Sequence, residues 1–542
     1  MGSGTAADSA NSTFSASTGW RDDGALESLS GIDAAFLAME TPTSRLHVAG
    51  VLVLDPPERD GERSGGPDLP TVGFDAIRRV VGERVERVPR LSRRAVRRPL
   101  DLQRPVWVEC EEIDLDTHVT RRVVAPPGGR RELDALVGEL LSRPLPISGP
   151  LWEMVVAEGV ADGRTAVVAR LHHAVLDGVS GASAMAAFLD VSPRAPGESG
   201  TLTLRGSPRS SLPFARPGTI VTSWDAPGAA SPSSIGLVRD AAASFARQAA
   251  ALIPLVERST DALVAIGRHN KELAACGLSP PPAPFSAPRT SLNGNVTAQR
   301  RIATLAVPLA DLELVRRVLG SGTDAEGSPR GATVNDVILC AVGGALGRYL
   351  DAREEAPSRP LVALVPVSTR DRATVPAPSR AHVGNYVSGM LVPLATNVVD
   401  PVARLRTVAV AAEVAKVQED RAGGELLETF LRAIPPLLVS ASFRAAAQLS
   451  LFDRVAPPAN VVVSSIVVPD VSLWWAGHRV SAIYPAGPVA DGIGLNVTSM
   501  TYRGTVHFGI VSCPRLVPDV EELSVLLDDA IAELVAAALD GA

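Results

Sequence analysis

Two adjacent histidines, followed closely by an acidic residue and a glycine, form the segment of this chain best suited to chemistry. His172 and His173 lie in the stretch RLHHAVLDGVSG, and Asp177 and Gly178 follow. The apolar run AVVARLHH predicts a buried strand that ends at His173, and Gly178 predicts a turn before a helix of small residues. Successive side chains on a strand point to opposite faces, so only one of the two histidines is expected to meet a substrate.

General base catalysis suits such a histidine better than the alternatives. Two neighbouring histidines on a strand rarely bind one metal ion, and no Cys, His or Glu follows at zinc-ligand spacing, so no metal site is expected. Ser180 lacks the GxSxG context of a serine nucleophile. A histidine with a pKa of about 6.5 is largely neutral at pH 7 and can accept a hydroxyl proton. Two core histidines that bond backbone groups are the structural alternative.

Asp177 has two possible roles in this segment. It could orient the imidazole directly, or it could fix the loop by pairing with an arginine. The second role is favoured, because a turn residue beside the conformationally free Gly178 points back into the scaffold.

Length and composition describe a globular chain of more than one domain. The 542 residues exceed the roughly 100–200 residues of a typical domain several-fold. Hydrophobic residues make up 46% and charged residues 20%, which argues against overall disorder. The formal net charge is -7, so neither nucleic acid nor another polyanion is expected as a global partner.

The expected compartment is the cytoplasm. Four isolated cysteines form no CxxC pair, as is typical of a reducing compartment. The N-terminal stretch MGSGTAADSANSTFSASTGWRDDG is polar and lacks the apolar centre of a signal peptide. No window reaches the roughly 18 apolar residues of a membrane span. Any membrane contact is therefore expected to be peripheral.

Composition divides the chain into four parts. Residues 1–27 are expected to form a disordered tail, and residues 28–190 an α/β lobe that carries the histidine motif. Residues 191–290 are expected to be a Pro/Gly/Ser-rich linker with a long helix at 235–270. A second α/β lobe is expected over residues 291–542.

Individual elements are predicted in both lobes. In the first, residues 165–173 form a buried strand and residues 131–142 a helix. In the second, TVNDVILCAVGGALGRYL at 333–350 forms a helix, and residues 494–512 form a hairpin that turns at Arg503 and Gly504.

The histidine segment also carries a family resemblance. HHAVLDG matches the HHxxxDG motif of the CoA-dependent acyltransferase superfamily. Within that superfamily the chain resembles the bacterial wax ester synthase/acyl-CoA:diacylglycerol acyltransferase family from about Leu29 to the C-terminus. The matching segments are, in order, GIDAAFLAMETPTSRLHVAG, GPLWEM, LNG, TVNDVILCAVGGALGRYL, VPVSTRDR, GNYVSGMLVPL and GLNVTSMTYRGTVHFGIV.

The resemblance implies a fold, a base and a reaction. The fold is α/β of the α+β type: two chloramphenicol-acetyltransferase-like lobes, each a mixed β-sheet with flanking helices, enclose an active-site tunnel. His173, the second histidine of the motif, is implied to be the general base, which leaves His172 as a structural neighbour. The implied reaction transfers a long-chain acyl group from acyl-CoA to diacylglycerol or a fatty alcohol. Acyl-CoA is then a co-substrate, and no cofactor is expected.

Donors for the oxyanion of the transition state are expected in the second lobe. Asn335 is the first candidate, with Ser464 or Ser465 behind it. Asn335 and Asp336 also stand where a helix begins, so both could instead stabilise the helix start. Function and structure are equally open for Asn335, and structure is favoured for Asp336.

Further residues of the matching segments are expected to support the site. Pro150, Leu151 and Trp152 are expected to line the acyl channel or to pack in the core. Arg370 is a candidate buried partner of Asp177.

The two apolar substrates that the resemblance implies require access from a lipid surface, either the inner membrane surface or lipid inclusions. Candidate contacts are residues 425–443 and a basic run of seven arginines from Arg84 to Arg98, although both could be ordinary packing or solvated surface. Two other functions are open: an acyltransferase that uses a carrier-protein thioester or another acceptor, and a lipid-binding relative without catalysis. The oligomeric state is open as well.

Overall fold

The computed structural model describes most of both predicted lobes. The described residues are 27–56, 73–98, 101–145, 149–176, 181, 184–193, 266–323, 329–368, 385, 387–422, 431, 434–468 and 470–541. Nearly all of the predicted tail and the greater part of the 191–290 linker lie outside them. Within the linker, residues 266–275 are helical.

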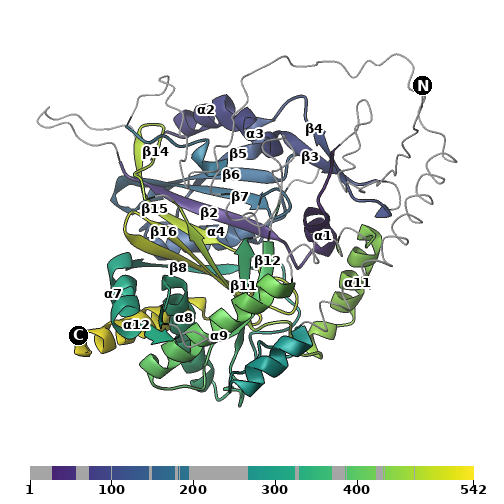
Figure 1. The fold of residues 1–542 in the computed structure, drawn as a ribbon. Helices are drawn as coiled ribbons and strands as arrows, with labels where there is room; N and C mark the ends of the chain where they lie inside the picture. The colour runs from purple at the N-terminus through teal and green to yellow at the C-terminus, as the bar shows by residue number, and fades with distance from the viewer. Residues whose placement is uncertain are drawn as a thin grey trace, which may run out of the picture.

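The first lobe is built on a mixed six-stranded sheet (Figure 1). Its strands are, in spatial order, β14 (Trp474–Trp475), β15 (His478–Ala486), β2 (His47–Leu54), β7 (Arg164–His172), β6 (Trp152–Val160) and β5 (Val119–Val123). All neighbours are antiparallel except β5 and β6. β7 is buried along nearly its whole length, because elements cover both faces of the sheet.

Helices cover both faces of this sheet. They are α1 (Gly31–Met39), α2 (Phe74–Arg84), α3 (Leu115–His118) and α4 (Arg130–Leu141). Leu52 of β2 packs in one core cluster with Ile77 of α2, whereas its neighbour Val51 packs in another with Val137 of α4. The alternation of strand side chains therefore places α2 and α4 on opposite faces. A small sheet of β1 (Glu27–Ser28), β4 (Val106–Glu109) and β3 (Arg93–Val96) adjoins α1.

The second lobe has its own mixed six-stranded sheet. Its strands are, in spatial order, β12 (Val387–Pro393), β11 (Val362–Ser368), β13 (Val461–Val467), β16 (Leu495–Tyr502), β17 (Thr505–Ser512) and β8 (Arg301–Pro308). Figure 1 shows a layer of helices beneath this sheet: α7 (Leu309–Leu319), α8 (Val334–Asp351), α9 (Pro401–Ala422) and α12 (Val520–Asp540). α8 contacts the other three and is buried on nearly every side, as an apolar helix at the centre of a layer should be.

The two sheets are joined by strands that leave the second lobe. β14 and β15 lie beyond residue 291 but pair with the first sheet, where β15 covers the edge of β2. A division of the sequence at 291 therefore does not separate the two sheets in space. An uncovered β2 would expose a row of unpaired backbone groups, which β15 satisfies. A Cβ atom added at Gly509 of β17 would lie 1.7 Å from the Pro485 carbonyl oxygen of β15, so the strands approach there without room for a side chain.

Locally encoded elements form where the sequence predicts them. α4 spans Arg130–Leu141, and α8 begins at Val334. β16 and β17 form the predicted hairpin, and both turn residues, Arg503 and Gly504, have positive φ (49° and 68°). A two-residue turn with two positive φ angles matches the twist of the strands it joins.

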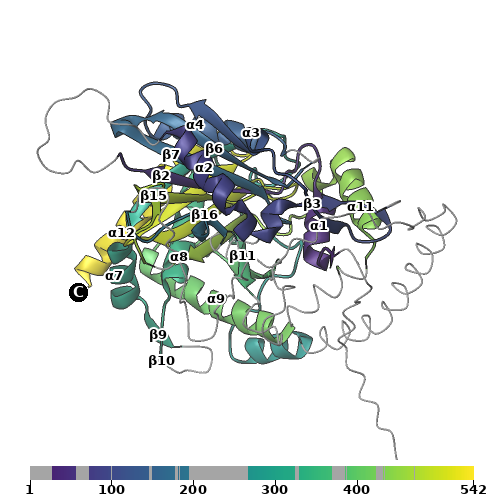
Figure 2. The same ribbon diagram turned by 90° about the horizontal axis from the view of Figure 1, so that it is seen from above.

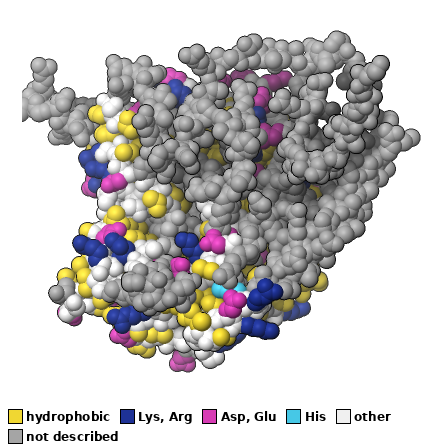
Figure 3. All heavy atoms as spheres, viewed as in Figure 1, with side chains coloured by type: hydrophobic (Ala, Val, Ile, Leu, Met, Phe, Trp, Pro, Cys, Tyr) yellow, Lys and Arg dark blue, Asp and Glu magenta, His cyan; other side chains and the backbone are white. Residues whose placement is uncertain are grey.

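Helix α11 (Pro436–Gln448) lies beside α1 in both Figure 1 and Figure 2. It begins at Pro436, and the fixed φ of a proline at the first helical position suits a helix start. Within the described part of the chain, no helix is long and apolar enough to cross a membrane. On the face drawn in Figure 3, basic and acidic side chains are interspersed over the described surface.

Candidate active site

The histidine motif lies at the end of the buried strand β7. His172 is the last residue of β7 and pairs with His47 of β2, and His173 is the first residue of the turn. The His173 N–H donates to the Leu46 carbonyl oxygen (2.8 Å), and the Val175 N–H donates to that of His172 (2.9 Å). The strand thus ends one residue before its predicted end, and backbone hydrogen bonds fix the turn that presents His173.

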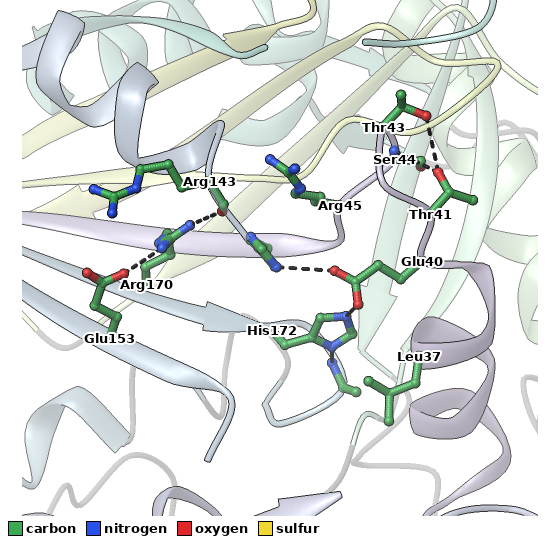
Figure 4. A network of polar contacts seen from close by, with 12 residues as sticks. Leu37, Glu40, Thr41, Thr43, Ser44, Arg45, Arg143, Glu153, Arg170 and His172 are labelled. Atoms are coloured by element: carbon green, nitrogen blue, oxygen red, sulfur yellow. Dashed lines mark hydrogen bonds and ion pairs between the residues drawn. The ribbon is translucent and has the colours of Figure 1, made fainter. Parts of the chain in front are cut away.

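The ring of His172 has one hydrogen bond, at Nδ1, and a carboxylate close to Nε2. Its Nδ1 atom accepts a hydrogen bond from the Ala174 N–H (3.0 Å), and its Nε2 atom lies 3.5 Å from Oε2 of Glu40 (Figure 4). Because Nδ1 accepts, the proton of the neutral ring lies on Nε2 and faces the carboxylate. His172 is 1% exposed. Its ring therefore connects Glu40 to the turn that follows the strand.

Glu40 serves two histidines. Its Oε1 atom lies 3.3 Å from Nε2 of His47. Burial alone would raise the pKa of Glu40, but hydrogen bonds from His172 and His47 outweigh it and hold the pKa well below the usual range. Burial lowers the pKa of His47 to about 4, although Glu40 opposes the shift. At neutral pH the network therefore contains an ionised Glu40 and a neutral His47.

Arg170 extends this network toward helix α4. It precedes His172 by two residues on β7, so both side chains lie on the same face of the sheet. Its guanidinium pairs with Oε2 of Glu153 and donates to the carbonyl oxygen of Arg143, just after α4 (Figure 4). It also donates to the carbonyl oxygen of Leu140 in the last turn of α4. A buried cation that bonds helix C-terminal carbonyls satisfies groups that would otherwise lack partners.

His173 is surrounded by residues from both lobes. The Phe36 ring of α1 lies 4.4 Å from its ring, centroid to centroid. Nδ2 of Asn385, just before β12, donates to the His173 carbonyl oxygen (2.7 Å) and to Oδ1 of Asp33 (2.6 Å). His173 is partly exposed, unlike His172. A substrate can therefore approach His173, whereas His172 is enclosed by the protein.

Asn335 and Asp336 have different environments at the start of α8. Asp336 forms a capping box with Thr333, which accounts for its burial. Asn335 takes no part in the cap. Its Oδ1 atom accepts a hydrogen bond from the Ser465 hydroxyl of β13 (2.8 Å), and Ser465 in turn accepts one from Ser499 of β16 (3.0 Å). None of the residues described here as contacting Asn335 is also described as contacting His173.

Ser464 and Ser465 point to opposite faces of β13, since they are neighbours on one strand. Only Ser465 contacts Asn335 through its hydroxyl, whereas Ser464 supplies a backbone carbonyl to Ser499 (3.3 Å). Of the two serines, Ser465 is thus the one joined to the first oxyanion candidate.

The residues Pro150, Leu151 and Trp152 pack inside the first lobe. All three are buried, and Leu151 and Trp152 belong to its core cluster. The Trp152 indole donates to the Leu91 carbonyl oxygen (2.8 Å) and stacks on His118 at 4.5 Å. The two predicted locations are the acyl channel and the core, and these contacts are those of residues that pack in the core.

Three predicted site residues lie outside the described residues: Asp177, Gly178 and Arg370. The pairing of Asp177 with Arg370 stays a prediction. Among the described residues, no group of three or more His, Cys, Asp or Glu side chains could hold a metal ion.

The basic run of the first lobe is largely paired within the chain. Arg84 pairs with Asp190, and Arg97 pairs with Asp101. Arg90 and Arg93 both contact Glu27. These contacts favour ordinary packing over a contact with a lipid surface.

Sequence reasoning did not single out Glu40, Arg170 or Asn385. Glu40 and Asn385 lie inside matching segments, AMETP and GNYVS, and Arg170 lies in the histidine stretch itself. Because Arg170 stands two positions before His172 on a predicted strand, the sequence alone indicates that the two side chains lie on the same face of the sheet. No local signal assigns the partners of Glu40 or Asn385.

Comparisons with known proteins match most of the chain to one family. Residues 29–338 match the model of the wax ester synthase/diacylglycerol acyltransferase catalytic domain, and residues 383–535 match that of the C-terminal domain. A chain of Mycobacterium tuberculosis (strain CDC 1551 / Oshkosh) named as a diacylglycerol O-acyltransferase is 31% identical over 522 residues, 96% of this chain and 91% of its own length. A second from that strain is 29% identical and covers 93% and 97%.

Solved structures agree on the fold. The wax ester synthase/diacylglycerol acyltransferase of Marinobacter aquaeolei VT8 superposes with a TM-score of 0.62 at 24% identity and covers 95% of this chain and all of its own. A condensation domain of the calcium-dependent antibiotic synthetase gives 0.52 at 16% and covers 96% and 98%. The predicted α/β architecture of two acyltransferase lobes is confirmed.

Proposed function

The chain belongs to the wax ester synthase/diacylglycerol acyltransferase family, and on that premise we propose that it moves a long acyl chain from acyl-CoA to the hydroxyl of a diacylglycerol or a fatty alcohol. The product is a triacylglycerol or a wax ester. The observation that carries the proposal is the strand end at which the His172 ring is buried between the Ala174 N–H and Glu40, while His173 is presented by a hydrogen-bonded turn.

His173 is the general base of this reaction. It accepts the hydroxyl proton of the acceptor while the acceptor oxygen bonds to the thioester carbonyl carbon. The tetrahedral intermediate then expels the CoA sulfur, which takes the proton back from His173. Proton transfer by a positioned histidine typically contributes about 10²–10⁴-fold to such a reaction. His172 does not suit this role, because its Nδ1 atom accepts from the Ala174 N–H, its Nε2 atom faces Glu40, and the residue is 1% exposed.

Asn335 supplies a donor for the oxyanion. The Ser465 hydroxyl holds its Oδ1 atom, which fixes the amide plane and leaves Nδ2 as the donating end. A donor aimed in advance at developing charge stabilises the transition state by roughly 2.7–4 kcal/mol. The site that combines this donor with His173 lies between the lobes, in the tunnel that the family resemblance implies.

The protein binds lipid surfaces peripherally, through α11 and the turn after it. Exposed apolar side chains follow one another there: Leu437, Leu438, Leu449, Leu451 and Val455. Exposed Arg444 and Arg454 lie among them. Apolar side chains with nearby cations are the composition of a segment that lies at an anionic lipid interface. α11 also packs on α1, which carries Phe36, so the lipid surface would lie one helix from His173.

Release of CoA thiol from palmitoyl-CoA tests the function most directly. Wild-type protein should release thiol only when an acceptor such as dioleoylglycerol or hexadecanol is present, and mass spectrometry should detect the ester. His173→Ala should abolish ester formation while the circular dichroism spectrum stays unchanged, and His172→Ala should retain measurable turnover. Full activity of His173→Ala would refute the base assignment.

The same assay separates the two alternative functions. An acyltransferase that needs a carrier-protein thioester would be inactive with palmitoyl-CoA and active with the acylated carrier. A lipid-binding relative without catalysis would release no thiol with any donor. A panel of acceptors then identifies the preferred product.

A further inference from the structure

We propose that Asn385 is a positioning residue, which holds the backbone of the base His173 in place across the two lobes. This inference rests on the proposed function, since it concerns the residue that acts as the base. Asn385 itself need not touch a substrate. It acts through one carbonyl group, that of His173, and through one carboxylate, that of Asp33.

The side chain of Asn385 uses both hydrogens of its amide nitrogen. Nδ2 lies 2.7 Å from the His173 carbonyl oxygen and 2.6 Å from Oδ1 of Asp33. Both partners are acceptors, so the nitrogen and not the oxygen of the amide must face them. The backbone N–H of Asn385 also donates to Oδ1 of Asp33 (3.3 Å). Asn385 is 3% exposed, and water does not compete freely for these bonds.

Asp33 is a fixed anchor for this amide. It lies in the first turn of α1, where the Ser30 side chain accepts a hydrogen bond from its N–H, and it is fully buried. Nη1 of Arg90 lies 3.8 Å from its Oδ2 atom. Arg90 is itself held over the Trp107 ring, 4.6 Å from the centroid. Burial raises the pKa of Asp33, and Arg90 and Asn385 oppose this by favouring the carboxylate.

Three chain segments therefore meet at one amide. α1 and the turn after β7 belong to the first lobe, whereas Asn385 precedes β12 at the edge of the second sheet. A shift of either lobe would move the His173 carbonyl and, with it, the start of the turn that carries the ring. Because a misplacement of about 1 Å can cost roughly 100-fold in rate, such a contact bears on the chemical step rather than on substrate affinity.

The near-isosteric change Asn385→Asp tests this role. It replaces the shared donor by acceptors that face Asp33 and the His173 carbonyl. We expect kcat to fall about 10–100-fold, with KM for palmitoyl-CoA changed less than about twofold. Asp33→Asn keeps an acceptor for the amide and should lose much less activity. Wild-type kcat in a folded Asn385→Asp protein would overturn the proposal.

The exchanged pair Asp33→Asn with Asn385→Asp separates positioning from stability. It restores an amide facing a carboxylate between the lobes but leaves the His173 carbonyl without its donor. The proposal predicts that Tm recovers relative to Asn385→Asp while kcat stays low. Recovery of kcat together with Tm would mean that Asn385 only stabilises the fold, and would overturn it.

Thr304→Val is the matched control, since Thr304 of β8 binds Asp134 of α4 across the lobes without contacting His173. It should lower Tm and leave kcat unchanged, and an equal loss of kcat would also overturn the proposal. His173→Ala, measured alongside, separates the two failures. If that variant is active, the base assignment fails. If it is inactive while Asn385→Asp is fully active, only the positioning role fails.

Discussion

Oε2 of Glu40 lies 3.5 Å from Nε2 of His172, on the side of the ring opposite the Ala174 N–H. The first histidine of the motif therefore connects a carboxylate before β2 to the backbone beyond the second histidine. It orders the turn that presents His173. In the HHxxxDG pattern, the second histidine, His173, reacts in the proposed mechanism, and the first histidine, His172, holds the turn that carries it.

Glu40→Gln should weaken this arrangement. The carboxylate of Glu40 has two acceptor oxygens, one for each histidine, whereas a glutamine amide has only one. Its nitrogen would therefore face the N–H of either His172 or His47, and two donors would meet. A buried donor left without a partner costs about 1–3 kcal/mol, so we expect a lower Tm and a kcat reduced about tenfold. Thermal melts and steady-state kinetics measure both. The exposed carboxylate Glu112 offers a control, Glu112→Gln, and identical behaviour of the two variants would contradict the role of Glu40.

Asn335→Ala should remove transition-state stabilisation. Loss of one oxyanion donor typically lowers kcat about 10²–10³-fold, and Ser465→Ala should cost less because it only frees the amide to rotate. Asp336→Ala, one residue further along, should lower Tm through the lost capping box, worth about 1 kcal/mol, and leave kcat in place. If Asn335→Ala changed Tm alone, Asn335 would be structural.

Flotation with phosphatidylglycerol vesicles tests the lipid surface on α11. The double variant Leu438→Glu with Leu449→Glu adds two charges to the apolar surface, and bound protein should fall several-fold. Leu539 and Val525 of α12 are exposed to a similar degree, 62% and 60%, so their Glu variants are the matched control. Equal losses in both double variants would mean that added charge, and not this surface, governs binding.

Gly509→Ala should be severely destabilising. The added Cβ would lie 1.7 Å from the Pro485 carbonyl oxygen, a backbone atom that no rotamer change can move away. β15 would have to move away from β17, and this would disturb its pairing with β2. We expect little folded protein, by yield and by thermal melt. Gly331→Ala, where no atom lies within 4 Å of the added Cβ, should fold normally, and a normally stable Gly509→Ala would show that β15 can shift.

Sequence patterns predicted the elements whose causes are local. The hairpin of β16 and β17 follows from apolar strands around Arg503 and Gly504, and the start of α8 from polar residues before an apolar helix. The motif histidines follow from one short segment. In each case the residues that determine the structure are neighbours in the chain.

The remainder depends on contacts between distant segments. No strand is predicted at β15, and its local sequence does not indicate which sheet it joins. Glu40 and Asn385 gain their roles only when α1, β7 and the start of β12 meet. A single sequence contains the residues of such a network without the distances that select them, so the positioning residues emerge only from the fold.

The contact between Asp134 of α4 and Thr304 of β8 should make the free energy of unfolding depend on pH. Asp134 accepts hydrogen bonds from the Thr304 N–H (3.0 Å) and hydroxyl (2.9 Å), and burial raises its pKa to about 7 against these contacts. The folded state therefore binds this proton more tightly than the unfolded chain, whose carboxyl has a pKa of about 3.9. The resulting stability is complete below pH 4 and is lost as pH rises through 7. Asp134→Asn can keep both contacts without a charge, so its Tm should match the wild type near pH 4 and exceed it increasingly toward pH 8. Parallel Tm curves for the two proteins across that range would contradict the raised pKa.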